Sequence, residues 1–216
     1  MSEDWLTAVK RQRSLAVIRT HQFELGKQLA FAVAAGGMRL IEITWNSRQA
    51  ANLIAQLRSE LPDCLIGAGT LLNVAQLQAA IAAGAQFCFS PHVDPNLIQA
   101  ATSEGVPIIP GAFSPTEILT AWQLGATSVK VFPIQSLGGP SYIRSLQGPL
   151  GHIPLIPTGG VTLTNARDFI DAGAIAVGLS THLFPEAAIA ANDWNYISKR
   201  TQNLIQQLFA GNNKHD

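Results

Sequence analysis

The sequence has 216 residues, of which 47% are hydrophobic, and it carries 14 Lys and Arg against 14 Asp and Glu. The length suits one domain over residues 1–216, close to the lower size limit of an eight-fold β/α barrel. The balanced charge gives no field toward nucleic acid or an anionic membrane, so neither is an expected partner.

The chain opens on a charged segment, Met1–Arg13, which lacks the apolar core of a secretion signal. We expect a helix over Asp4–Gln12 that closes the bottom of a barrel. No run approaches the roughly 18 apolar residues of a membrane span. Cys64 and Cys88 lie in apolar runs, where a free thiol behaves as a small hydrophobe. A cytoplasmic protein without a disulfide is therefore expected.

Short β-rich runs alternate with longer amphipathic runs along the chain. Eight strands are expected: Leu15–Arg19, Leu40–Thr44, Leu65–Gly67, Phe87–Ser90, Pro107–Pro110, Val129–Phe132, Pro154–Pro157 and Ile175–Leu179. The expected helices include Glu24–Ala35, Gln49–Glu60, Val74–Ala83, Pro95–Glu104, Thr116–Leu124, Asn165–Ala172 and, at the end, Asp193–Phe209. This alternation predicts a parallel sheet.

Glycine marks the end of several expected helices, within residues 34–37, 82–85, 124–126 and 171–174. It would supply the left-handed residue that caps a helix. The repeat spacing of about 20 to 26 residues shows no break between domains. Eight units in so short a chain favour a closed (β/α)8 TIM barrel with an extra N-terminal helix, and a doubly wound open sheet is the alternative.

Lys130 is the one lysine of five that falls within an expected strand. Alternation places it on the same face as Ser128 and Phe132, which we expect to be the barrel interior. Desolvation lowers the pKa of a lysine toward the range where the free amine is nucleophilic, as imine chemistry requires. The alternative is a structural ion pair.

Glu42 is the one acidic residue of fourteen inside a strand core, and Thr44 follows on the same face. An ion pair between Glu42 and Lys130 would explain two buried charges, but not the other polar strand ends. Those ends belong at one rim of a barrel. They are Arg19, Thr70, Ser90, His92 and Thr158-Gly159-Gly160.

Residues 158–160 after the seventh strand, with Ser180-Thr181 after the eighth, fit the phosphate site common in barrels. The alternative is that the glycines serve only a tight turn. His92 has no Cys, His or carboxylate partner at ligand spacing, so it is not a favoured site residue. No metal-binding motif is present, and neither a metal nor another cofactor is expected.

Six motifs occur in a fixed order: Ile41–Thr44, Gly67–Thr70, Ser90-Pro91, Pro110-Gly111, Lys130–Pro133 and Pro157–Gly160. With them the chain resembles the 2-keto-3-deoxy-6-phosphogluconate aldolases, many of which also cleave 4-hydroxy-2-oxoglutarate. The resemblance runs from Ala16–Arg19 to Leu183–Pro185. It implies a class I aldolase acting on a small 2-oxo acid, and a homotrimer.

The resemblance also implies roles for residues. Lys130 would form the Schiff base, Glu42 would be the general acid/base, Thr70 would bind the substrate carboxylate, and Phe132 would lie beside the pyruvyl methyl. The glycines and hydroxyls of the rim would hold a phosphate with Arg19. The full set of expected substrate-binding residues is Arg19, Thr44, Asn46, Thr70, Pro91, Phe132, Thr158, Gly159, Gly160, Ser180 and Thr181.

Two places depart from the family pattern, Asn46 and the loop at 178–181. Many members carry Arg four residues after the glutamate, to bind the carboxylate, and this chain has Asn46, with Arg48 nearby. The run at 42–47 is similar to that of the 2-keto-3-deoxy-6-phosphogalactonate aldolases, whereas Thr158 is the gluconate-type residue. The loop at 178–181 differs from the Gly-Gly-Ser form of some members.

The predicted reaction is cleavage of 2-keto-3-deoxy-6-phosphogluconate to pyruvate and glyceraldehyde 3-phosphate, and of 4-hydroxy-2-oxoglutarate to pyruvate and glyoxylate. One alternative is the galactonate substrate. A second is a phosphate-binding barrel that acts as an isomerase or synthase without an imine. A third is a barrel without catalytic activity.

Overall fold

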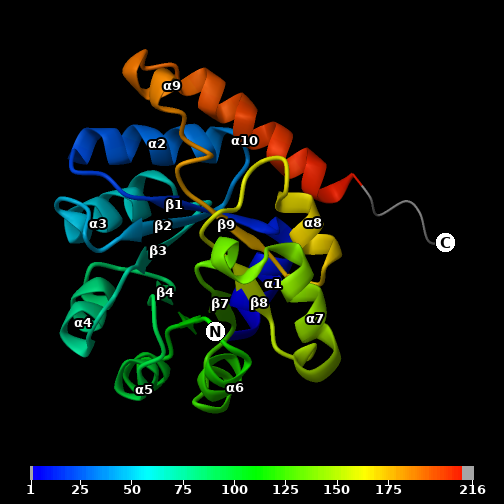
Figure 1. Cartoon of the computed structure of the whole chain (residues 1–216). Helices are drawn as coiled ribbons and strands as arrows, with labels where there is room; N and C mark the ends of the chain where they lie inside the picture. Colours follow the sequence, from blue (N-terminus) through cyan, green and yellow to red (C-terminus); the bar gives the residue numbers. More distant parts are fainter. Residues whose placement is uncertain (1, 211–216) are drawn as a thin grey trace.

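The computed structural model describes residues 2–210 and shows strands that curl around an interior, with helices outside them (Figure 1). The strands are β1 (Ser14–Ile18), β2 (Leu40–Thr44), β3 (Leu65–Gly69), β4 (Cys88–Phe89), β5 (Ile108–Ile109), β6 (Gly111–Ala112), β7 (Val129–Val131), β8 (Leu155–Pro157) and β9 (Val177–Leu179). No described helix is long and apolar enough to cross a membrane.

The helices alternate with the strands along most of the chain. They are α1 (Ser2–Gln12), α2 (Phe23–Ala35), α3 (Ala50–Glu60), α4 (Val74–Ala82), α5 (Pro95–Ser103), α6 (Pro115–Gln123), the 3₁₀ helix η1 (Ile134–Leu137), α7 (Pro140–Leu150), α8 (Ala166–Asp171), α9 (Glu186–Ala190) and α10 (Trp194–Phe209). In Figure 1, α10 lies along α2 on the outside of the sheet.

All described strand pairs are parallel, as the alternation predicted. One sheet has the order β5-β4-β3-β2-β1-β9 and the other has the order β6-β7-β8. The expected fifth strand, Pro107–Pro110, is observed only as β5, and the chain continues into β6 beyond the expected range. Pro110 separates the two strands, because it has no backbone N–H to give to a ladder. The first strand pairs with the last, which differs from the order of a doubly wound sheet. The fold is an α/β fold with a curled parallel sheet.

Alternation along the strands produces two apolar layers. One lies between sheet and helices and includes Ile41, Val129 and Val131. The other fills the interior of the curled sheet and includes Leu40, Phe87, Phe89, Ile109 and Ile156. Side chains alternate between the two faces of a strand, so Val129 and Val131 are buried against the helices and Lys130 points into the interior.

Helix α1 supplies Trp5 to the interior layer. The Trp5 ring lies 4.8 Å from the Phe87 ring and 6.2 Å from the Phe89 ring, measured between centroids. The Trp5 indole N–H donates to Ser128 Oγ over 3.3 Å. The indole is thereby both packed and hydrogen-bonded, as a buried tryptophan requires.

The glycine caps are confirmed. Gly37, Gly84, Gly125 and Gly173 follow helix ends with φ of 95°, 93°, 100° and 105°. These values lie in the left-handed region, which glycine adopts without steric cost. Each cap ends a helix and releases the chain into the next strand.

Candidate active site

A pocket of about 430 Å³ opens at the carboxyl ends of the strands. Most of the residues expected from the sequence line it: Arg19, Glu42, Thr70, Pro91, Lys130, Phe132, Thr158, Gly159, Gly160, Ser180 and Thr181. These residues come from seven segments that are far apart along the chain and meet because parallel strands end at one edge.

Lys130 on β7 and Glu42 on β2 come from different sheets and face the same pocket. Their exposed fractions are 6% and 1%. Both Glu42 carboxylate oxygens are buried and have no hydrogen-bond partner in the part of the chain that the structure describes. The ion pairs within 4 Å in residues 2–210 are Lys27–Glu60 and Arg167–Asp171. The lysine and the glutamate therefore line one pocket without an ion pair between them.

Gly69 makes room for the Glu42 carboxylate. A Cβ atom on residue 69 would lie 1.6 Å from Glu42 Oε1, far inside van der Waals contact. Residue 69 pairs with Thr44 across the β2–β3 ladder, whereas Glu42 pairs with Gly67. A Cβ atom on Gly67 would instead meet the Phe87 ring at 2.3 Å, so Gly69 is the glycine of β3 that gives the carboxylate its space.

Burial sets the electrostatics of the two groups. Burial raises the pKa of Glu42, and the positive charges of Lys130 and Arg19 oppose that rise. Burial also lowers the pKa of Lys130; the Glu42 charge opposes this fall, and the Arg19 charge adds to it. Desolvation favours the neutral form of each group. A neutral amine beside an acid that holds its proton can attack a carbonyl and receive help in losing water.

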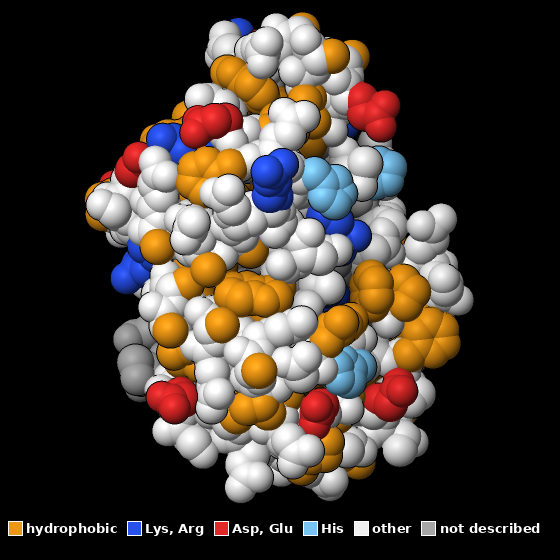
Figure 2. Space-filling model, turned by 90° about the vertical axis from the view of Figure 1, so that its left-hand side faces the viewer, with side chains coloured by type: hydrophobic (Ala, Val, Ile, Leu, Met, Phe, Trp, Pro, Cys, Tyr) orange, Lys and Arg blue, Asp and Glu red, His pale blue; other side chains and the backbone are white. Residues whose placement is uncertain are grey.

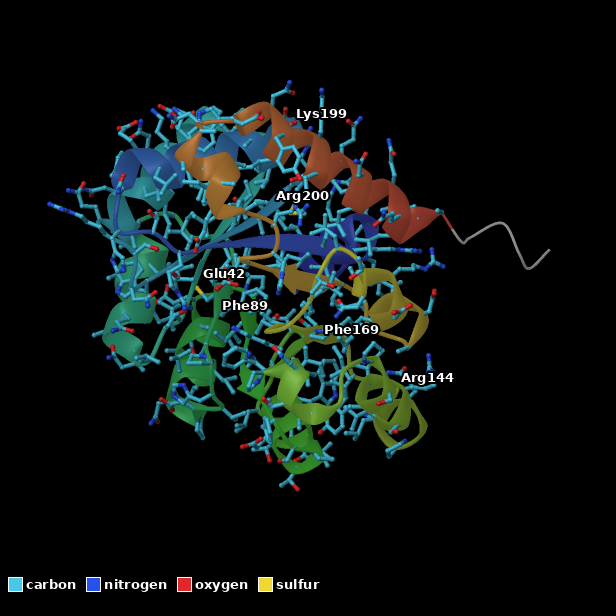
Figure 3. The ribbon with its side chains drawn as sticks, turned by 45° about the horizontal axis from the view of Figure 1, so that its top comes forward. Glu42, Phe89, Arg144, Phe169, Lys199 and Arg200 are labelled. Carbon is cyan, nitrogen blue, oxygen red and sulfur yellow. The ribbon has the colours of Figure 1, made fainter. Side chains whose placement is uncertain are left out.

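Two aromatic rings flank the lysine. Lys130 Nζ lies 4.6 Å from the centre of the Phe132 ring and 5.8 Å from the centre of the Phe89 ring. The sequence indicated Phe132 and missed Phe89, although Phe87 and Phe89 alternate on one face of their strand. Figure 3 shows Glu42 and Phe89 in the central part of the molecule. The rings form an apolar setting for the amine.

Thr70 reaches the pocket from a strained backbone. Its φ is 58°, and a left-handed conformation is an outlier for a β-branched residue. Such strain concentrates at functional sites, where the surrounding structure holds the residue in place. The neighbouring Leu71 N–H donates to the Phe89 carbonyl over 3.2 Å, which ties this turn to β4.

The far end of the pocket is rich in backbone and hydroxyl groups. Gly159 and Gly160 have φ of 83° and 94°. The Gly159 carbonyl accepts from the Gln135 N–H over 3.0 Å, and the Gly160 carbonyl accepts from Asn165 Nδ2 over 3.2 Å. Ser180 and Thr181 complete this end with Arg19. Two glycines with their backbone amides and two hydroxyl side chains therefore line one end of the pocket.

Gln135 and His182 also line this end, and neither was expected from the sequence. Both lie close to expected motifs: Gln135 is two residues after Pro133, and His182 follows Thr181 directly. On the face drawn in Figure 2, His and Lys or Arg side chains lie close together above the middle of the molecule, with acidic side chains toward the edges.

Two expected substrate-binding residues lie outside the lining of this pocket. Thr44 Oγ1 lies 3.1 Å from Ser47 Oγ, and Ser47 Oγ accepts from the Thr20 N–H over 3.2 Å. Asn46 is exposed on the turn between them. The turn folds back onto the chain after β1, as the Arg48 N–H bond to the Thr20 carbonyl shows. That path places Thr44 in a structural network and Asn46 at the surface.

A hydrogen bond joins Ser90 and His92, two residues that the sequence placed at the rim. Ser90 Oγ donates to the His92 carbonyl over 2.6 Å, and of this segment Pro91 lines the pocket. Among the described residues, no three His, Cys, Asp or Glu side chains gather as metal ligands would.

Comparison with known proteins matches nearly the whole chain to one enzyme family. The family profile described as KDPG and KHG aldolase matches residues 6–200; KDPG is 2-keto-3-deoxy-6-phosphogluconate and KHG is 4-hydroxy-2-oxoglutarate. A 2-dehydro-3-deoxy-phosphogluconate aldolase of Treponema pallidum is 37% identical over 199 residues, which cover 92% of this chain and 95% of the relative. A KHG/KDPG aldolase of Escherichia coli K12 is 32% identical and covers 88% and 89%.

Solved structures agree with this match. The KDPG aldolase of Legionella pneumophila, with pyruvate captured as a covalent carbinolamine intermediate, superposes with a TM-score of 0.85 at 28% identity. The superposition covers 92% of this chain and 97% of that protein.

Proposed function

This chain belongs to the KDPG and KHG aldolase family and is a lyase, and on that premise we propose that Lys130 forms the Schiff base and Glu42 moves the protons. The observation that carries the assignment is the pair itself. A lysine and a carboxylate, each nearly inaccessible to solvent, face one pocket without an ion pair between them.

The proposed reaction begins with attack of the Lys130 amine on the C2 carbonyl of a 2-oxo acid. The resulting carbinolamine loses water with a proton from Glu42 and becomes a cationic imine. Glu42, now a carboxylate, takes the proton of the C4 hydroxyl while the C3–C4 bond breaks and its electron pair moves into the imine. An aldehyde leaves, and the remaining enamine takes its proton at C3 back from Glu42. Hydrolysis of the imine releases pyruvate and the amine.

The substrates we propose are 2-keto-3-deoxy-6-phosphogluconate and 4-hydroxy-2-oxoglutarate. The second product is glyceraldehyde 3-phosphate in the first case and glyoxylate in the second. Thr70 and the nearby backbone would hold the carboxylate, and Phe132 would pack against the pyruvyl methyl. The phosphate would lie at the rim formed by Gly159, Gly160 and Ser180-Thr181. The relatives' names do not favour the galactonate alternative.

Three finer features complete the proposal. The sheet closes into an eight-stranded barrel with α1 as its plug, which is supported by the parallel bridge between Thr158 and Gly178 and by the single residue that separates β5 from β6. The enzyme is cytoplasmic, consistent with two buried free cysteines. It is a homotrimer, and exposed Leu72 and Phe113 offer apolar surface that an interface would cover.

Borohydride trapping tests the proposed chemistry. Incubation with pyruvate and borohydride should add one reduced pyruvyl group to Lys130, identified by peptide mass spectrometry. Lys199 is exposed on α10 and is the matched lysine that should remain unmodified. Labelling at another residue, or none, would contradict the Schiff-base assignment.

A further inference from the structure

The loop after β9 forms part of the far end of the pocket. Ser180, Thr181 and His182 line the pocket there. The loop makes two short turns, in which the Leu183 N–H donates to the Ser180 carbonyl over 2.8 Å and the Phe184 N–H to the Thr181 carbonyl over 3.1 Å. Within residues 2–210, no backbone carbonyl accepts from the Thr181 or His182 N–H. These amides are available to another acceptor.

Arg200 holds this loop from outside the pocket. Its Nε and Nη2 both donate to the His182 carbonyl, over 3.2 and 3.0 Å. Arg200 is half-buried on α10 and is not part of the pocket lining. The helix is itself fixed, since Ile197 and Thr201 on either side of Arg200 are fully buried. The two bonds therefore tie the loop to a rigid element.

We propose that Arg200 is a positioning residue for the phosphate-bearing end of the substrate, acting through the loop at 180–184. The inference rests on the proposed function, because it assigns the phosphate to this rim. It adds a residue of another helix, 18 positions beyond the loop carbonyl that it binds.

The physical reason is the cost of ordering a binding loop. A loop that must be fixed when the ligand arrives loses conformational entropy at that moment, which weakens binding. A planar guanidinium with two N–H groups on one carbonyl fixes both the position and the direction of that peptide group. Phosphate binding at the rim depends on this loop, whereas Schiff-base formation at Lys130 does not. Loss of Arg200 should thus weaken binding of the substrate with a distal phosphate and leave Schiff-base formation with pyruvate unchanged.

The experiment compares Arg200→Leu with Lys199→Leu. Lys199 is the adjacent, exposed residue on the same helix, so its variant removes the same charge without touching the loop; Figure 3 shows both side chains on α10. Steady-state kinetics with 2-keto-3-deoxy-6-phosphogluconate and with 4-hydroxy-2-oxoglutarate give KM and kcat separately. Inorganic phosphate is added as an inhibitor of 4-hydroxy-2-oxoglutarate cleavage, and pyruvate trapping by borohydride reports on Lys130.

For Arg200→Leu we expect KM for the phosphorylated substrate and Ki for phosphate to rise about ten-fold, equivalent to about 1.4 kcal/mol. The kcat, the KM for the unphosphorylated substrate and the trapping rate should stay near the wild-type values. Arg200→Lys, which has no planar pair of donors, should fall between the two. Lys199→Leu should behave as wild type.

Two results would overturn the inference. One is an unchanged KM for the phosphorylated substrate, and the other is an equal rise in KM for both substrates, which would mean that Arg200 only supports the fold. If Arg200→Leu does not fold, the Arg200→Lys kinetics decide between the same outcomes. A failure of the proposed function is seen separately in the wild-type enzyme, as absent trapping at Lys130 or absent inhibition by phosphate.

Discussion

A charged residue inside a parallel strand is the most informative single feature of this sequence. Such strands are covered on both faces, so a charge there must be paired or used. Lys130 and Glu42 stood out for that reason, and the structure places both in one pocket. Thr44 and Asn46 did not follow, because the path of the turn after β2 depends on the Thr20–Ser47 bond. A local sequence pattern does not predict a hydrogen bond between residues 27 positions apart.

Replacing Glu42 by Gln should remove proton transfer while leaving the shape of the pocket. We expect kcat to fall by about 10² to 10⁴, the usual contribution of a general acid/base. Borohydride trapping of pyruvate at Lys130 should persist on long incubation. Retention of near-normal kcat would remove Glu42 from the mechanism.

Replacing Gly69 by Ala should damage activity through Glu42, since a Cβ there meets Glu42 Oε1 at 1.6 Å. The carboxylate must move, and we expect kcat to fall about ten-fold or more, because small displacements of a catalytic group are costly. Gly148→Ala is the control: it lies in α7, with no atom within 4 Å of the added Cβ. That change should leave kcat unaltered and add up to about 1 kcal/mol of stability. Equal kcat in both variants would contradict the packing argument.

At the scale of elements, periodicity predicted most helices and strands to within a few residues. The residues that it missed are those near proline and glycine. Helix α7 begins at Pro140 and contains Gly148 and Pro149, so its helical signal is weak. Proline also explains the missed strand β6, which follows Pro110, the last residue of the expected strand Pro107–Pro110. Phe89, Gln135 and His182 required the packing of neighbouring strands, which periodicity does not report.

Trp5→Ala tests the contribution of α1 to the interior. The side chain is 2% exposed and contacts Phe87 and Phe89, and truncating a buried aromatic residue costs about 3–5 kcal/mol. Urea unfolding should show a loss of that size. Trp5→Phe keeps an aromatic ring and loses the bond to Ser128 Oγ, so its loss should be smaller. Thr7→Ala, exposed on the same helix, should change little; an equal effect at positions 5 and 7 would mean that α1 does not depend on its buried face.

At the scale of the whole molecule, the two buried ionisable groups of the candidate site, Glu42 and Lys130, lower the stability of the fold. Most polar groups that a fold buries are hydrogen-bonded, whereas both oxygens of Glu42 lack a partner among the described residues. Lys130 is buried beside two phenylalanine rings. The proposed function gives a reason for such a pair, because imine chemistry needs an acid and a desolvated amine. Stability and activity are therefore in conflict at these two positions.

The pH dependence of unfolding measures that conflict. Burial raises the pKa of Glu42 in the folded protein above its unfolded value, with Lys130 and Arg19 opposing the rise. The folded state then binds the Glu42 proton more tightly, so the free energy of unfolding falls as pH rises from the unfolded carboxyl pKa, about 4.3, to the folded one. Gln at position 42 does not titrate, so Glu42→Gln should be more stable than wild type at neutral pH. Its advantage in Tm should shrink as the pH is lowered toward 4.3.

The variant also loses the Glu42 charge that favours protonated Lys130. This loss reduces the advantage in Tm but does not reverse its sign, because burial is the largest cause of the raised Glu42 pKa. Glu104→Gln, at an exposed carboxylate, is the control for the change in net charge. A Tm difference between Glu42→Gln and wild type that stays constant from pH 4 to pH 8, or that matches Glu104→Gln, would mean that burial of Glu42 does not govern its protonation.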